Sequence, residues 1–272
     1  MPRRQLLKGA GALSLAAILR PTAVFAECDD EGERLGPFGP WSRPVNLGPV
    51  VNSRFHERRC AISKDGLSLY ITSDRPGGVN GPNPPPPLLH RLEIWVSQRA
   101  SIDGPWQAPV NLDAFNTTPV INAVGRGTAN PNLSADEHLL FFQSGRPGGP
   151  PGSANGSFHI WVSTLGDDGS FGPAVLVPEL SSPKEETLTA IRRDGLEFFL
   201  SSSRPNGLIG KNDIWVSTRG NTLDPWSTPV NLGSTVNYPG SVTGAPALSW
   251  DGTTLYFYSC LLYTSPSPRD RG

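Results

Sequence analysis

The sequence has few cysteines and almost no net charge. Only three of its 272 residues are Cys, and neither they nor the four His have the spacing of a zinc site. Lys and Arg number 23 against 24 Asp and Glu, which gives a net charge of −1. This balance provides no bulk electrostatic field for a nucleic acid or an anionic membrane, so we expect neither as a partner.

The sequence also lacks helical periodicity and recognisable cofactor motifs. After residue 26 no segment repeats its apolar residues every 3.6 positions. No phosphate-binding loop, dinucleotide fingerprint or Gly-x-Ser-x-Gly motif occurs, so no cofactor is expected. Gly and Pro, in contrast, number 30 and 29, well above their usual share. An all-β protein accommodates such residues in its turns, whereas a helical protein does not.

A pattern of short apolar stretches separated by turn residues is repeated along the chain. Full copies begin at Asp65, Asp136 and Asp194, and a partial copy begins at Asp251, so the intervals are 71, 58 and 57 residues. Apolar stretches punctuated by Gly, Pro, Asn, Asp and Ser are typical of strands joined by turns. A period of this length favours propeller blades. We therefore predict an all-β protein, a β-propeller over residues 41–259 with four blades of four antiparallel strands, the last blade incomplete.

The two ends of this repeat are complementary. The predicted inner strands are residues 60–63, 131–134, 189–192 and 246–249; in the first copy the second, third and outer strands are residues 68–72, 92–97 and 107–112. Residues 41–47 match an outer strand, whereas the last copy has only opening strands. A propeller avoids a free edge when its N-terminal strand completes the last blade. We therefore expect residues 41–47 to be the outer strand of the blade that begins at Gly244.

The repeat resembles that of the TolB-type, WD-repeat-like β-propeller family. The resemblance rests on Ser63-Lys64-Asp65-Gly66, on residues 69–78 and on the acid-Ile-Trp segment that follows. It implies the fold but not the function, because propellers host binding modules and enzymes alike. The second copy departs from the pattern at the three positions Glu137, Gly145 and His159, where the family pattern has Gly, Asp and an acid. Its strands are expected, but its ion pair is not.

Residues 1–26 have the organisation of an export signal. Arg3 and Arg4 precede a mild apolar run at residues 9–19, which is too short to span a membrane, and residues 24–26 fit a cleavage site. The arginine pair resembles a twin-arginine signal; an ordinary secretory signal with a basic start is the alternative. We expect a soluble periplasmic or secreted monomer, with residues 27–40 as a linker.

The cysteines and the C-terminal tail leave two questions open. In an oxidising compartment Cys28 and Cys60 either form a disulfide or remain free thiols. Residues 260–272 break the repeat where Asp-Arg-Pro-Gly-Gly is due. We interpret this tail as non-native, similar to translated sequencing-adapter sequence, in which case the last blade lacks its third strand and Cys260 is not native.

Arginines and tryptophans recur at fixed places in the repeat. We predict structural ion pairs between Arg75 and Glu93 and between Arg204 and Asp213, in preference to a ring of cations that binds an anion or glycan. The Trp of each Ile-Trp pair is predicted to pack between blades rather than to stack on a sugar. These are Trp95, Trp161 and Trp215.

The polar stretches that precede the inner strands differ from blade to blade. In a propeller we expect them at the mouth of the central channel, where the fold most often binds ligands. The candidate ligand-binding residues are His56, Glu57, Arg58, Arg59, Arg126, Thr128, Asn130, Lys184, Glu186 and Thr243. We expect the Glu57 and Glu186 carboxylates to face each other across the channel; alternatively, each pairs with a nearby cation such as Arg59 or Lys184.

Two functional hypotheses follow. The favoured one is an exported recognition module that binds a protein, peptide or glycan at the channel mouth. The alternative is a glycoside hydrolase or sialidase-like enzyme with its active site there. Sialidase-type sites use an arginine cluster, a tyrosine nucleophile and paired acids. Glu57, Arg58 and Arg59 are available, but no Tyr is adjacent to them in the sequence.

Overall fold

The computed structural model describes residues 42–81, 92–114, 120–166, 168–208, 212–249 and 251–260. The chain divides into two units, Met1–Val45 and Asn46–Gly272. The export signal and linker predicted for residues 1–40 lie outside the described residues, as does the predicted tail beyond Cys260. Among the described residues no helix is long and apolar enough to cross a membrane.

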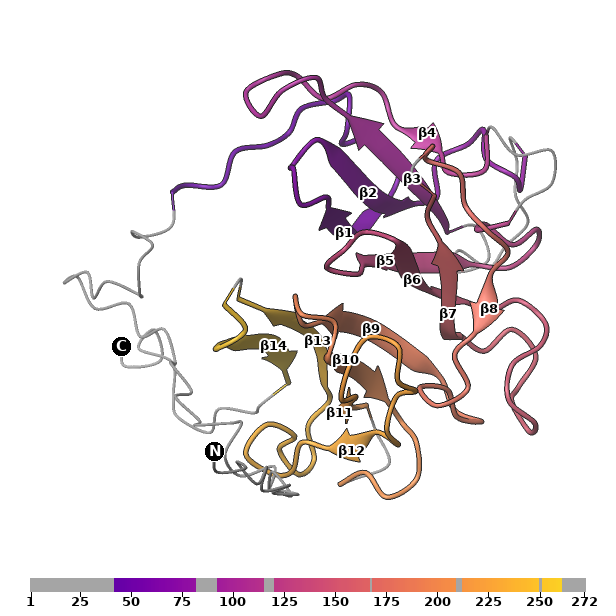
Figure 1. Ribbon diagram of the computed structural model, residues 1–272, viewed down its shortest axis with the longest axis vertical. Coiled ribbons are helices and arrows are strands. Elements are labelled where there is room, and N and C mark those ends of the chain that lie inside the picture. Colours follow the sequence, from indigo (N-terminus) through magenta and orange to yellow (C-terminus); the bar gives the residue numbers. More distant parts are fainter. Residues whose placement is uncertain are drawn as a thin grey trace, which may run out of the picture. The chain divides into compact units, whose positions relative to one another are not determined.

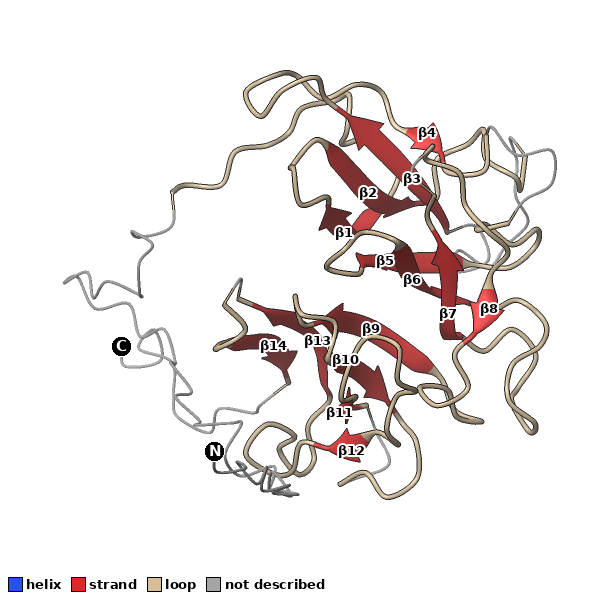
Figure 2. Cartoon of the chain, in the orientation of Figure 1, coloured by secondary structure: helices blue, strands red, loops and turns tan. Residues whose placement is uncertain are grey.

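The second unit, Asn46–Gly272, is a β-propeller made of four antiparallel sheets (Figure 1). Its described residues form strands and loops without a helix (Figure 2). We number the sheets as blades 1 to 4. Blade 1 contains β1 (Glu57–Ile62), β2 (Ser68–Ser73), β3 (Glu93–Gln98) and β4 (Val110–Asn111). Blade 2 contains β5 (Thr128–Leu133), β6 (Leu139–Ser144), β7 (His159–Thr164) and β8 (Val175–Leu176). Blade 3 contains β9 (Glu186–Ile191), β10 (Glu197–Ser202), β11 (Asp213–Thr218) and β12 (Val230–Asn231). Blade 4 contains β13 (Thr243–Leu248) and β14 (Leu255–Ser259).

The hairpin between the first two strands of each blade is set by its turn residues. Asp65 Oδ1 accepts hydrogen bonds from the Ser63 hydroxyl at 2.5 Å and from the Leu67 amide at 2.9 Å. The next residue has a positive φ, 72° at Gly66, which glycine adopts without strain. Glu137 takes the same conformation in blade 2 with a φ of 61°, so the departure from Asp-Gly leaves the hairpin intact.

Two predicted strand lengths need correction. The inner strands begin three residues earlier than expected, at Glu57, Thr128, Glu186 and Thr243, because each passes through a β-bulge and then continues its pairing. The outer strand of blade 1, expected over residues 107–112, is only two residues long.

The predicted completion of the last blade is not observed. Residues 42–47 form no strand, and Leu47 is 49% exposed. Outer strands in this fold pair only with third strands: β4 with β3, β8 with β7 and β12 with β11. Blade 4 has no third strand among the described residues, so an outer strand has nothing to pair with.

The hydrophobic core lies between neighbouring blades. One cluster joins Phe141 and Ile160 of blade 2 to Phe198 and Trp215 of blade 3, and another joins blades 1 and 2 around Trp161. The three repeat tryptophans are 4–6% exposed. Trp161 and Trp215 belong to these clusters between blades, which confirms the packing predicted for them. Trp95 instead packs with Val51 and with Leu69 and Ile71 of its own blade. Burial of a large apolar side chain contributes about 1.5–3 kcal/mol.

Candidate functional site

The four inner strands share an unusual backbone feature at one position. Arg59, Asn130, Leu188 and Ala245 occupy the bulge of β1, β5, β9 and β13 with φ values of 41°, 55°, 52° and 56°. Non-glycine residues in this left-handed region cost about 1–3 kcal/mol each and persist only where the surroundings enforce them. The repetition in all four blades shows that the bulge is part of the fold.

Hydrogen bonds between blades hold the bulges of β5 and β13. The Asn130 amide donates to Thr72 Oγ1 of β2 at 2.9 Å, and the Ala245 amide donates to Ser201 Oγ of β10 at 3.3 Å. In these two blades the bulged backbone is thus fixed by the second strand of the preceding blade. The second halves of the inner strands lie around a common space.

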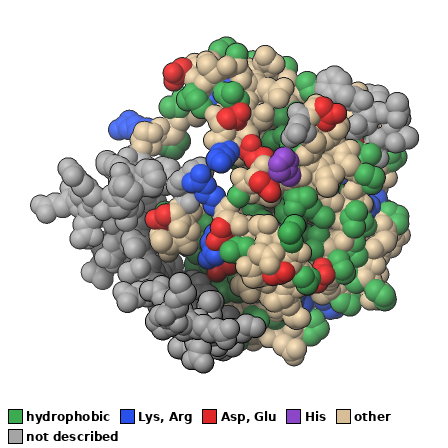
Figure 3. Space-filling model, in the orientation of Figure 1, with side chains coloured by type: hydrophobic (Ala, Val, Ile, Leu, Met, Phe, Trp, Pro, Cys, Tyr) green, Lys and Arg blue, Asp and Glu red, His purple; other side chains and the backbone are tan. Residues whose placement is uncertain are grey.

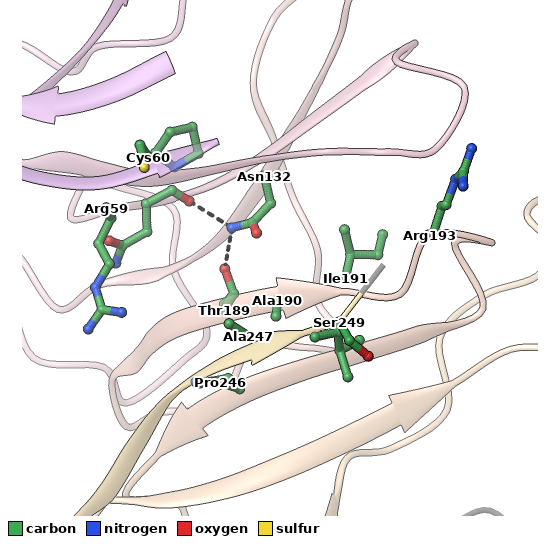
Figure 4. A pocket seen from close by; sticks show the side chains of 13 residues that line it. Arg59, Cys60, Asn132, Thr189, Ala190, Ile191, Arg193, Pro246, Ala247 and Ser249 are labelled. Carbon is green, nitrogen blue, oxygen red and sulfur yellow. Dashed lines mark hydrogen bonds between the residues drawn. The ribbon is translucent and has the colours of Figure 1, made fainter. Parts of the chain in front are cut away.

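That space is a pocket of about 500 Å³, within the range of small-molecule sites. Figure 4 shows side chains from several inner strands around it. Asn132 Nδ2 donates to Thr189 Oγ1 at 2.8 Å and to the Asn130 carbonyl at 3.1 Å, which ties β5 to β9 across the pocket. The lining residues are Arg59, Cys60, Asn130, Pro131, Asn132, Thr189, Ala190, Ile191, Arg193, Pro246, Ala247, Leu248 and Ser249.

The charged residues of the pocket lining are all positive. Two arginines, Arg59 and Arg193, contribute to it, and none of its residues is an acid. Arg59 exposes part of its surface, yet burial of its remainder lowers its pKa, an effect opposed by the charges of Tyr258 and Cys60. The molecular face in Figure 3, in contrast, intersperses charges of both signs.

Two of the predicted site residues, Arg59 and Asn130, line the pocket. Four others begin the inner strands and contact the serine that ends the second strand. Glu57 accepts from Ser73 at 3.4 Å and Glu186 from Ser202 at 3.3 Å. The threonine hydroxyls of Thr128 and Thr243 lie 3.3 Å from Ser144 Oγ and Ser259 Oγ. None of these four lines the pocket.

The remaining predicted residues lie apart from the pocket. His56 Nδ1 is 3.2 Å from Asp74 Oδ2, and the backbone amide of His56 donates to Asp74 Oδ1 at 2.7 Å. Arg126 donates to Asn155 Oδ1 at 2.9 Å. Arg58 and Lys184 are exposed.

The predicted ion pairs are wrong in their partners. Arg75 binds Glu57 at 2.9 Å, and Arg204 binds Glu186 at 3.1 Å. Each guanidinium also donates to a backbone carbonyl, at 2.8 Å in both cases, and lies over the Trp of its own blade at 5.6 Å and 5.5 Å. The antiparallel pairing of the first two strands brings the glutamate beside the arginine, closer than the acid on the third strand.

The acids before the Ile-Trp pairs have a different role. Glu93 accepts from the amides of Val79 and Asn80 at 3.0 Å, and Asp213 accepts from the Leu208 amide at 2.7 Å. They hold the connection between the second and third strands. Glu57 and Glu186 are each held by an arginine of their own blade, which is the alternative foreseen for them, with Arg75 and Arg204 as the cations in place of Arg59 and Lys184.

Sequence reasoning missed four polar residues of the pocket wall or its rim: Asn132, Thr189, Arg193 and Ser249. Three of them belong to the predicted inner strands, so polar residues within an expected strand were the available signal. Cys60 is a free, exposed thiol in this wall, and Cys28 lies outside the described residues.

Comparisons with known proteins give only distant structural similarities. No protein-family model matches the sequence, and no curated protein matches it. The periplasmic gluconolactonase of Pseudomonas aeruginosa is 17% identical with a TM-score of 0.43 over 73% of this chain, which spans about half (49%) of that protein's length. An α-L-arabinofuranosidase from Clostridium thermocellum is 19% identical with a TM-score of 0.44, covering 78% of this chain and 66% of its own.

Proposed function

We propose that the protein is a recognition module whose inner-strand pocket binds a small acidic sugar, such as a hexuronate. The observation that carries this proposal is the pocket lining, in which two arginines and several amide and hydroxyl groups surround about 500 Å³ and no acid is present. Carboxylates pair with guanidinium groups through charge-assisted hydrogen bonds. Sugar hydroxyls match the side chains of Asn132, Thr189 and Ser249.

The test compares two sugars that differ only at one carbon. Galacturonate has a carboxylate where galactose has a hydroxymethyl group, so titration calorimetry with both measures the contribution of the charge. We expect galacturonate to bind at least about tenfold more tightly, a difference of about 1.4 kcal/mol. Arg59→Gln is expected to remove that preference. The matched control is Arg58→Gln, the neighbouring exposed arginine outside the lining. Equal binding of both sugars, or equal loss in both variants, contradicts the proposal.

An enzymatic alternative is supported by Tyr258 of β14, whose electrostatic interaction with Arg59 opposes the lowering of the Arg59 pKa. A tyrosine beside an arginine provides two of the groups that sialidase-type catalysis uses. Against it, Glu57 and Glu186 are held by Arg75 and Arg204 outside the pocket lining. Fluorogenic sialosides and chromogenic glycosides incubated with purified protein test this alternative: turnover that is lost in Tyr258→Phe would replace the binding proposal with an enzymatic one.

The propeller family and the cellular location of the protein are part of the same proposal. We place the protein among TolB-type propellers on the residues of its repeat, and outside the cytoplasm on residues 1–26. A reporter fused to residues 1–30 tests the export route. Export that stops when Arg3 and Arg4 are both replaced by Lys supports the twin-arginine route, and unchanged export supports the ordinary secretory route.

A further inference from the structure

The inner strand of blade 2 has polar residues at two positions where other blades are apolar. The four inner strands align through their bulges and through their pairing with the second strands. Asn132 of β5 then stands at a position that is alanine in the other three blades, namely Ala61, Ala190 and Ala247. Asn130 occupies the bulge, where blades 3 and 4 have Leu188 and Ala245. Both asparagines line the pocket, so the departure from the repeat concerns the pocket wall.

Gln143 of β6 is a third departure in the same blade. Its counterparts are Thr72 in blade 1 and Ser201 in blade 3, whose short side chains accept from the bulge amide of the following blade. Gln143 is longer, and its Oε1 accepts from Asn130 Nδ2 of its own blade. Gln143 is 2% exposed, and its Nε2 is buried without a hydrogen-bond partner in the described part of the chain. An unpaired buried donor lowers stability, so stability alone does not account for a glutamine here.

The hydrogen bonds of the two asparagines determine which end of each side-chain amide is free. Asn132 Nδ2 donates to the Asn130 carbonyl at 3.1 Å and to Thr189 Oγ1 at 2.8 Å, so both of its N–H groups are used (Figure 4). A reversed amide would set Asn132 Oδ1 against the Asn130 carbonyl oxygen, and two acceptors repel each other. Asn130 Nδ2 is held by Gln143 Oε1. Each asparagine therefore turns its N–H groups to the protein.

The free ends of these amides are hydrogen-bond acceptors. Among the described residues, buried side-chain atoms without a partner occur only in Trp95, Gln143 and Arg204. The two asparagine Oδ1 atoms have no protein partner either, so they remain accessible on residues that line the pocket. Hydroxyl and amino groups donate to an amide oxygen, whereas a carboxylate does not. The two arginines of the same lining repel an ammonium group, which leaves hydroxyl groups as the matching ligand chemistry.

We propose that Asn130 and Asn132 bind two neighbouring hydroxyl groups of the ligand as hydrogen-bond donors, and that Gln143 is the positioning residue that orients Asn130. The proposal rests on the acidic-sugar pocket proposed above and adds a specificity for adjacent, unmodified hydroxyls. The two asparagines lie on one strand and are joined by a hydrogen bond, so adjacent hydroxyls of a single sugar ring suit them. The carboxylate of the ligand is left to the arginines.

Deoxyfluoro sugars test which hydroxyls act as donors. Fluorine is similar in size to a hydroxyl group but cannot donate a hydrogen bond. Titration calorimetry with galacturonate and galactose, each fluorinated at one ring carbon at a time, measures the contribution of every ring hydroxyl. At two adjacent carbons we expect fluorination to weaken binding about tenfold, and elsewhere less than about threefold, as the loss of one hydrogen bond predicts.

Each asparagine variant copies a residue of another blade, so the fold has a precedent for it. Asn132→Ala copies Ala190, and Asn130→Leu copies Leu188. We expect each variant to bind the unmodified sugar about tenfold more weakly and to lose its sensitivity to fluorine at one of the two carbons, a different one in each variant. The matched control is Asn155→Ala, an exposed asparagine outside the lining, which should alter neither property.

Gln143→Ser, which copies Ser201, separates positioning from a structural role. It removes the buried unpaired donor, so urea unfolding should show stability unchanged or raised. Asn130 is then free to turn, so the effect of fluorine at the carbon assigned by Asn130→Leu should fall below about threefold. A Gln143→Ser protein that is less stable and keeps the full fluorine effect shows that Gln143 has only a structural role, which overturns its assignment.

The outcomes distinguish this proposal from the one on which it rests. Equal binding of galactose and galacturonate contradicts the acidic-sugar proposal, yet fluorine effects that the asparagine variants remove would still support the binding of hydroxyls. Preferred binding of galacturonate with fluorine effects that are equal at all carbons, or that both asparagine variants leave unchanged, overturns the present proposal alone. Binding of neither sugar overturns both.

Discussion

Glu186 and Glu57 occupy equivalent positions, and we expect their removal to have unequal effects. Glu186 is fully buried and has four side-chain partners: Arg204 at 3.1 Å, His159 at 3.0 Å, Ser182 at 2.5 Å and Ser202 at 3.3 Å. Glu57 has a similar arginine and two serines, but its side chain is 16% exposed and it has no histidine. Glu186→Gln removes the charge and keeps the shape.

The loss of unfolding free energy in Glu186→Gln follows from the arginine that the substitution leaves unpaired. Arg204 is 9% exposed at its side chain, so without the carboxylate it is a buried charge without a counter-charge. Breaking a buried ion pair in this way costs about 3–5 kcal/mol. Arg146 shows the electrostatic consequence: Thr128 stands where the glutamate would be, and burial lowers the pKa of Arg146 to about 10 despite the opposing charge of Asp113. For Glu57→Gln, where water reaches the site, we expect about 1.5–3 kcal/mol, the value of one hydrogen bond to a charged group.

Urea unfolding followed by tryptophan fluorescence measures both variants under the same conditions. A loss of 3–5 kcal/mol corresponds to a Tm lower by roughly 6–20 °C in a domain of this size. Glu57→Gln is the matched control, because it makes the same chemical change at the equivalent position. If the two variants lose the same free energy, or if Glu57→Gln loses more, burial does not determine the strength of these pairs and the reasoning fails.

Three further predictions concern a buried asparagine, a hairpin turn and a strand bulge. Asn237→Ala leaves the buried Ile214 amide and carbonyl without partners and should cost at least about 2 kcal/mol, whereas Asn52→Ala, which removes an exposed contact with Asn46, should cost less than about 1; urea unfolding compares them. The pKa of Asp251 is lowered to about 2, chiefly by the Ser249 hydroxyl. Its contribution to stability is therefore complete above its unfolded-state pKa near 3.8 and is lost as the pH falls through about 2, and NMR titration of Ser249→Ala should show this pKa raised. Leu188→Val places a β-branched residue at a φ of 52° and should destabilise the protein by about 1–2 kcal/mol in the same unfolding assay.

The repeat was sufficient to predict the fold because it combines two independent signals. Apolar stretches of strand length gave the second and third strands almost to the residue, and the Asp-Gly pairs gave the hairpins between the first two strands. The inner strands were predicted too short because their bulges are occupied by Arg59, Asn130, Leu188 and Ala245. None is glycine, so the sequence has no local sign of a left-handed residue at these positions.

The ion pairs were mispredicted for a related reason. The acids Glu93 and Asp213 recur before Ile-Trp and so suggest a repeated ion pair, but a strand bulge determines which inner-strand residue lies beside the arginine. With the bulge included, Glu57 pairs with Ser73, two residues before Arg75. The pocket was located only coarsely for the same reason, since its wall begins at the bulge and continues beyond the stretches that were expected to form the mouth.

The departures of blade 2 from the repeat are coordinated with the blade that follows. His159 replaces the acid that binds an outer-strand asparagine in blades 1 and 3, and Leu176 replaces that asparagine and packs against the core. The imidazole instead contacts Glu186 of blade 3. A polar contact within one blade is thereby exchanged for one between two blades, and the glutamate that binds Arg204 also joins blade 3 to blade 2. Glu57 has the same potential but no third strand before it among the described residues. Its side chain accordingly remains 16% exposed, whereas that of Glu186 is fully buried.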